Sequence, residues 1–350
     1  MLKRRNKNKA VKVKREKNVH KMNILDLNGQ INPENATYVA AMDLGTNSNR
    51  LLVGDEFGNP VYRDVKHVAL GEGLAENGVF SEEAVNRALN SFTEFAKILK
   101  TFKIKKYRAI ATAACRMNKH VADFIRKIKD ETDVDVEIIS EFEEARLTLK
   151  GAKLNAPDDK DYLIVYDLGG GSTEVTLATN DKEPKILATV SIPLGARNAT
   201  EMFSLVNYNK KGEKLLVAEV KHYMEEFFQK IEGIDYKGKT ALIATSSTPL
   251  RLASWCFGHP KYDMFAVDGL TIPIKRIEAL INKTLRMPLE ARTESVYIGK
   301  SRARIFVAAC IIFRTIYRAL EMSEMTASLK SAQEAIVREL CDEEEMAVNG

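Results

Sequence analysis

The sequence has few cysteines, a single tryptophan and no paired cysteine motif. Its 350 residues include four cysteines, at positions 115, 256, 310 and 341, and none belongs to a C-x-x-C pair. Scattered cysteines argue against a disulfide framework and against a cysteine-based zinc site. The five histidines also show no metal-ligand spacing. We therefore expect a protein of a reducing, cytoplasmic compartment whose stability depends on neither disulfides nor zinc.

Long apolar runs are missing as well. A membrane-spanning helix needs roughly 20 apolar residues. The best candidate, Phe306 to Ile316, is flanked or interrupted by arginines at 302, 304, 314 and 318, which predicts a buried helix instead. Because the N-terminal segment has no apolar signal core, we expect no secretion signal and no membrane partner.

The positive net charge is confined to one end of the chain. Residues 1–22 hold ten basic residues and one acidic residue, a charge of +9, which leaves −4 for the rest of a chain whose formal total is +5. Such a block is typical of a disordered tail, and we predict a tail and linker over 1–36. The tail is either solvated, or translated from a start upstream of Met22, or a binding segment for polyanions. Nucleic acid is expected nowhere else.

One six-residue frame occurs twice. Asp43–Ser48 and Asp167–Ser172 each follow an apolar run, contain an Asp and a Gly-bearing turn, and precede a second apolar run. This pattern predicts two β-hairpins. Glycine lets the backbone approach a ligand closely, and successive N–H groups form a concavity that binds anions. Two such turns predict a duplicated fold with phosphate between its halves.

The remaining pattern predicts an α/β architecture in which each half has three strands followed by alternating helices and strands. A polar segment, Ala156–Lys160, marks the boundary between the halves. In the first half we expect strands over 38–42, 50–55, 60–70, 107–113 and 134–139, and helices over 81–101, 118–131 and 141–154. In the second half we expect strands over 162–167, 174–178, 186–191 and 240–245, and helices over 196–203, 213–231, 248–257, 274–286, 302–320 and 328–340.

Five segments between residues 43 and 196 form a set of motifs: Asp43–Val53, Ala111–Arg116, Ile139–Arg146, Asp167–Glu174 and Ile192–Ala196. With them the chain resembles, from about residue 38 to about residue 340, the exopolyphosphatase / guanosine pentaphosphate phosphatase (Ppx/GppA) family of the actin-like, sugar-kinase superfamily. The most specific feature is the order of an E-E-A-R block and a D-L-G-G-G-S-T-E block, about two dozen residues apart. A lone GGGS would not be specific.

The resemblance implies two duplicated ribonuclease H-like (actin-like ATPase) domains with a cleft between them. The expected domains are 37–155 and 156–327, with the closing helix 328–340 packed back on the first domain. Mg²⁺ is the implied cofactor, and a homodimer is one assembly that the family allows. Chain-length preference and oligomeric state are not determined by the sequence.

The same resemblance implies roles for individual residues. Glu144 is the expected general base, with Glu174 as a second catalytic acid. The sequence alone favours a different interpretation, in which Glu143 and Glu144 stabilise the first turn of a helix electrostatically, and the family resemblance reverses this for Glu144. Asp43 and Asp167 are the expected Mg²⁺ ligands, although either could instead cap a turn. The expected phosphate-binding residues are Gly45, Thr46, Asn47, Ser48, Arg50, Arg116, Gly169, Gly170, Gly171, Ser172 and Thr173.

The implied function is Mg²⁺-dependent hydrolysis of the terminal phosphoanhydride of inorganic polyphosphate or guanosine pentaphosphate (pppGpp). Two alternatives stay open: a weakly active or non-catalytic sensor of these ligands, and a small-molecule kinase of the same superfamily. Two departures from the family pattern bear on them. Glu141 stands where the family has Gly, and a segment with Ser and Pro, Ala244–Pro249, replaces a glycine-rich loop.

Overall fold

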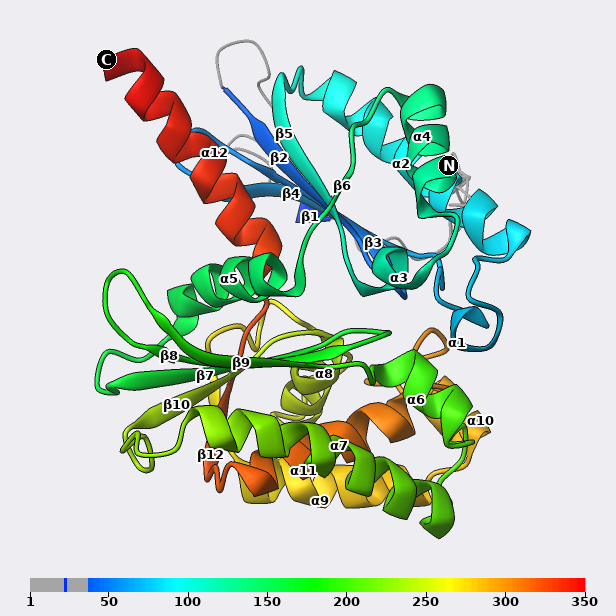
Figure 1. Ribbon diagram of the computed structural model, residues 1–350, viewed down its shortest axis with the longest axis vertical. Helices are drawn as coiled ribbons and strands as arrows, with labels where there is room; N and C mark the ends of the chain where they lie inside the picture. The colour runs from blue at the N-terminus through cyan, green and yellow to red at the C-terminus, as the bar shows by residue number, and fades with distance from the viewer. Residues whose placement is uncertain (1–21, 24–36, 350) are drawn as a thin grey trace, which may run out of the picture.

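The structure is a computed structural model that describes residues 22–23 and 37–349 (Figure 1). The predicted tail and linker, 1–36, lies outside these residues except at Met22 and Asn23. There the prediction is wrong, because Met22–Asn23 form strand β1, which pairs antiparallel with strand β4 (Pro60–His67). Without β1, strand β4 would be an edge with a row of unpaired backbone groups, to which a passing segment can bond.

The first half of the chain folds around a six-stranded sheet of order β1-β4-β3-β2-β5-β6. Strands β2, β3 and β4 form the predicted antiparallel meander, β5 pairs parallel with β2, and β6 pairs parallel with β5. The bounds are β2 (Val39–Leu44), β3 (Ser48–Gly54), β5 (Lys106–Ala111), β6 (Glu137–Ile138), α1 (Leu74–Asn77), α2 (Glu82–Thr101), α3 (Ala113–Met117) and α4 (Val121–Thr132).

The second half repeats this order in a sheet β11-β12-β10-β7-β8-β9, where β7, β8 and β9 are the meander and β10 and β12 are the parallel additions. Its helices α7, α9 and α11 lie together on one face of the sheet (Figure 1). The strand bounds are β7 (Tyr162–Leu168), β8 (Thr173–Thr179), β9 (Ile186–Ile192), β10 (Thr240–Ala244), β11 (Thr271–Pro273) and β12 (Glu324–Ala327). The helix bounds are α6 (Ala196–Met202), α7 (Lys210–Lys230), α8 (Ser247–Cys256), α9 (Ile274–Arg286), α10 (Leu289–Glu294) and α11 (Phe306–Ala319).

Helix α5 (Glu141–Ala152) lies between the sheets, and α12 (Ala332–Asn349) runs from beside it along the first sheet (Figure 1). Helix α12 packs on the first sheet in an apolar cluster that also contains Leu147 of α5. The opposite side of α5 packs on the second sheet through Leu149 and Ala152. Because α5 contacts both halves, the division at 155/156 stays a prediction, although the first sheet ends at Ile138 and the second begins at Tyr162.

Most predicted elements are present, and the differences have local causes. The helix expected over 302–320 begins only at Phe306, after a turn, and is buried as predicted. The helix expected over 328–340 begins at Ala332, because Glu324–Ala327 first form strand β12, and it runs on to Asn349. Strand β11 and the short helices α1, α3 and α10 were missed, since three to six residues carry too little periodicity to detect.

No helix in the described ranges, 22–23 and 37–349, is long and apolar enough to cross a membrane.

Helix α5 is in close backbone contact with Ser331, the residue just before α12, and this contact can be tested at Gly151. A Cβ atom on Gly151 would overlap the carbonyl group of Ser331. Helix propensity alone predicts that Gly151→Ala stabilises the protein by about 1 kcal/mol. The close contact predicts the opposite sign, a loss of about 1–3 kcal/mol in the free energy of unfolding.

Urea unfolding of the two proteins distinguishes these outcomes. Glu141→Ala, an exposed change on the same helix, serves as the control and should stay within about 0.5 kcal/mol of the wild type. A stabilised Gly151→Ala protein would contradict the close contact.

Candidate active site

The two predicted turns meet between the sheets. Asp43 and Asp167 occupy matching positions near the ends of β2 and β7. A Cβ atom on Gly170 would lie 2.9 Å from the Cβ of Thr46, so the turns are in contact and Gly170 tolerates no side chain. A cavity of about 60 Å³ lies between them. Since one water needs about 10–15 Å³ by this measure, the cavity has room for a small polar group.

Most of the predicted site residues line this cavity. They are Asp43, Gly45, Thr46, Asn47, Ser48, Arg50, Glu144, Asp167, Gly169, Gly170, Ser172 and Glu174.

Three predicted phosphate-binding residues do not line the cavity. The Thr173 hydroxyl donates to the Leu194 carbonyl at 2.6 Å, and Gly171 packs against the Thr46 side chain. Arg116 lies behind Glu144 and pairs with it. Gly169 does line the cavity, but its N–H donates to Ser172 O at 2.9 Å. This N–H closes the turn and is not free for phosphate.

Glu144 reaches the cavity from the first turn of α5. The helix starts there because the Ser140 hydroxyl accepts a hydrogen bond from the Glu143 amide at 3.1 Å. The Arg116 guanidinium lies 2.9 Å from Glu144 Oε2 and also donates to the Ile139 carbonyl, which fixes the carboxylate relative to the chain before the helix. Burial raises the pKa of Glu144 to about 7 against the opposing effect of Arg116.

Glu174 is the second acid, and it comes from the second hairpin. It lies directly across from Asp167 in the β7–β8 pairing, is 4% exposed, and accepts a hydrogen bond from Ser191. Burial raises its pKa well above the usual value, and the nearby charges of Glu144 and Asp167 raise it further. Two acids of raised pKa in one cavity are characteristic of sites that move protons.

The two aspartates fit a cation site that substrate would complete. Burial raises the pKa of both carboxyls, and Arg50 opposes this in each case. Arg50 Nη1 lies 3.3 Å from Asp43 Oδ2. In residues 22–23 and 37–349 no group of three acids, histidines or cysteines could hold a metal alone. Mg²⁺ commonly uses one or two carboxylates plus waters and phosphate oxygens, so two aspartates suffice.

The sequence reasoning missed Arg302, which lines the cavity from the turn before α11. Its Nε is buried without a hydrogen-bond partner, and it has no ion pair within the part of the chain that the structure describes. Burial, together with the neighbouring charges of Arg251 and Arg50, lowers its pKa to about 9. In the sequence, Arg302 was noted only as one of the arginines that flank an apolar helix, and no motif indicated that it would line a site.

The two departures from the expected pattern also have places in the structure. Glu141 is exposed and does not line the cavity. The segment Ala244–Pro249 ends β10 and begins α8, with Ser246 in a left-handed conformation at φ 75°. Ser247 lines the cavity from the start of this helix. The segment therefore contributes to the site without glycine.

Comparison with known proteins gives a family and a fold. The profile of the Ppx/GppA phosphatase family matches residues 53–344. A bifunctional 3-dehydroquinate synthase/phosphatase of Fusobacterium nucleatum is 34% identical over 284 residues, which are 74% of this chain and 41% of that protein. Exopolyphosphatase 2 of Mycobacterium tuberculosis is 34% identical over 179 residues, 47% of this chain and 54% of that protein. The matched part of this chain thus spans about half or less of either relative.

A solved structure has the same architecture. The exopolyphosphatase of Cytophaga hutchinsonii superposes with a TM-score of 0.80 at 22% identity, over 88% of this chain and 98% of that one. The predicted α/β fold of two actin-like domains is confirmed.

The burial of Glu174 predicts a gain in stability when its charge is removed. A carboxyl whose pKa is raised in the folded state contributes stability below its unfolded pKa and loses it as the pH rises through the folded pKa. Glu174→Gln should therefore raise Tm at pH 8 by about 2–4 °C, with a smaller gain at pH 5. Calorimetry at both pH values, with exposed Glu183→Gln as control, checks this. An equal gain at both pH values would contradict it.

Proposed function

The chain belongs to the Ppx/GppA phosphatase family, and on that premise we propose that it is a phosphoanhydride hydrolase that releases the terminal phosphate of inorganic polyphosphate. The observation that supports the proposal is the position of Glu144. Its carboxylate lines the same small cavity as the two turns Asp43–Ser48 and Asp167–Ser172. The name of the mycobacterial relative, an exopolyphosphatase, supports polyphosphate as the substrate. Guanosine pentaphosphate ends in the same kind of bond and is the substrate to compare.

In this proposal Glu144 accepts the proton of the attacking water. Its raised pKa of about 7 suits a general base near neutral pH. The Arg116 guanidinium holds one carboxylate oxygen, so that the base has a fixed orientation. The hydroxyls of Thr46 and Ser172, which line the cavity, are suited to donate to oxygens of the terminal phosphate.

Asp43 and Asp167 would hold Mg²⁺, which neutralises negative charge on the phosphate oxygens when it is bound. Without a cation, both carboxyls have raised pKa values because burial penalises their charge. A divalent cation would remove that penalty.

Arg302 and Arg50 are suited to the phosphate next to the one that leaves. Both line the cavity, and Arg302 has no carboxylate partner among the described residues. A guanidinium matches phosphate oxygens with two parallel N–H donors. A substrate with at least two linked phosphates would supply the anion that Arg302 lacks.

The role of Glu144 as base can be tested by substitution. Glu144→Gln should lower kcat for phosphate release from polyphosphate by about 10²–10⁴-fold, because the amide cannot accept the proton. Release is measured with Mg²⁺ on polyphosphate and on pppGpp, with exposed Glu141→Gln as control for α5. If the wild type binds either ligand tightly and releases nothing, the protein is a sensor. Phosphate appearing on an acceptor only with ATP would make it a kinase.

The role of Arg302 in substrate binding can be tested in the same way. Arg302→Gln should raise KM for polyphosphate about 10–100-fold with little change in kcat, because a charge-assisted contact is worth roughly 1.5–3 kcal/mol. The exposed Arg304, two residues along the same turn, gives the matched control Arg304→Gln, which should change KM little. An unchanged KM for Arg302→Gln would remove Arg302 from the substrate site.

A further inference from the structure

The two glutamates of the E-E-A-R block point to different partners. Glu144 lines the cavity and pairs with Arg116. Glu143 lies outside the cavity lining and accepts hydrogen bonds from Arg146 at 2.7 and 2.9 Å and from Arg108 at 2.9 Å. Adjacent residues of an α-helix lie about 100° apart around its axis. Within one helical turn, Glu144 therefore lines the cavity, and Glu143 belongs to a second cluster of charged residues.

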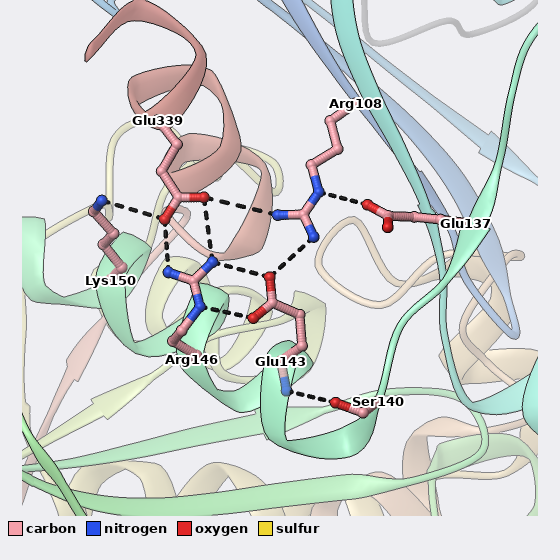
Figure 2. Close-up of polar contacts among 7 residues, drawn as sticks. All are labelled: Arg108, Glu137, Ser140, Glu143, Arg146, Lys150 and Glu339. Atoms are coloured by element: carbon pink, nitrogen blue, oxygen red, sulfur yellow. Dashed lines mark hydrogen bonds and ion pairs between the residues drawn. The ribbon is translucent and has the colours of Figure 1, made fainter. Parts of the chain in front are cut away.

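That second cluster is an ion-pair brace, which we define as Arg108, Glu143, Arg146, Lys150 and Glu339 (Figure 2). In Figure 2, Arg146 lies between Glu143 and Glu339 and contacts both oxygens of each carboxylate. Bidentate arginine–carboxylate pairs are stronger and more directional than single contacts. The brace thus fixes the orientation of the first turns of α5 as well as their distance from α12.

The members of the brace come from α5 and from the first half of the molecule only. Arg108 belongs to β5 in the first sheet, and Glu339 belongs to α12, which packs on that sheet. The polar contacts of the chain just after α5 are with the second half instead. Lys153 donates to the Asn180 carbonyl at 2.8 Å, and Asn155 donates to the Ser328 hydroxyl at 3.0 Å. The first turns of α5 are thus held by the first half of the molecule, and the segment just after α5 is held by the second half.

Apolar packing does not assign α5 to either half, because the helix packs on α12 through Leu147 and on the second sheet through Leu149 and Ala152. The brace, in contrast, connects the first turns of α5 to the first half only. Resting on the proposed function, we propose that the brace is a positioning device that holds the first turns of α5 on the first half. Glu144 then stays beside Asp43, and any opening of the cleft moves it relative to Asp167.

The charges of the brace persist at any working pH. Hydrogen bonds from Arg146 hold the pKa of Glu143 near 2, against the opposing effect of burial. The brace is also accessible to salt, because its side chains are between 21% and 39% exposed. Ionic strength, and not pH, is therefore the variable that weakens it.

The test uses Glu339→Gln, which lies on α12 outside the cavity lining. Backbone hydrogen exchange at residues 145–148 should become several-fold faster in this variant, and kcat for polyphosphate should fall about tenfold with KM unchanged. In the wild type, added salt should speed this exchange, and in the variant it should have little further effect. Glu137→Gln is the matched control, because Glu137 pairs with Arg108 and does not touch α5.

A double variant separates a brace from independent contacts. If the ion pairs act as a unit, Glu143→Gln combined with Glu339→Gln should lower kcat little more than either change alone. Losses that multiply would overturn the proposal. Unchanged exchange in Glu339→Gln, or faster exchange with unchanged kcat, would also overturn it. If the wild type releases no phosphate, the proposed function fails, and the exchange measurements still decide whether the brace holds α5.

Discussion

Four carboxylates lie around one small cavity, and the rest of the structure is arranged to hold them there. Asp43, Glu144, Asp167 and Glu174 come from four separate elements, β2, α5, β7 and β8. Burying ionised carboxylates is costly unless they are paired, and burial indeed raises the pKa of all four. The guanidinium groups of Arg50 and Arg116 oppose this effect, together with hydrogen bonds that involve Ser172 and Thr245. The cavity is thus prepared for added positive charge and for proton transfer.

The duplicated hairpin explains how these acids reach one place. Asp43 lies across from Arg50 in the first hairpin, and Asp167 lies across from Glu174 in the second. The strand register is the same in both hairpins. The residue opposite the aspartate is a cation, Arg50, in the first hairpin and an acid, Glu174, in the second. Two hairpins of the same register therefore support an asymmetric site. The first turn is suited to hold an anion through charge, and the second half adds an acid near Glu144, the proposed base.

The fold connects this site to distant parts of the chain through α5 and α12. The contact between Gly151 and Ser331 lies beside the cavity, because Ser331 and Ala332 line it. The first turn of α5 carries Glu144, and the brace ties that turn to β5 and α12. A helix from the end of the chain thus determines where a carboxylate from its middle lies. Such long-range contacts cannot be deduced from local periodicity.

The hairpins, the α/β order and most of the cavity lining could be predicted from the sequence, because Asp-Leu-Gly turns and apolar periodicity are encoded within a few consecutive residues. The sequence also placed Glu144 at the start of a helix, where Ser140 caps the first turn. Local patterns did not predict that Arg302 lines the cavity, that Thr173 and the Gly169 amide form internal hydrogen bonds, or that Arg146 links Glu143 to Glu339. The physical reason is that burial, ion pairing and the absence of a partner depend on residues far apart in the chain, which meet only when the two sheets and helices α5 and α12 are assembled.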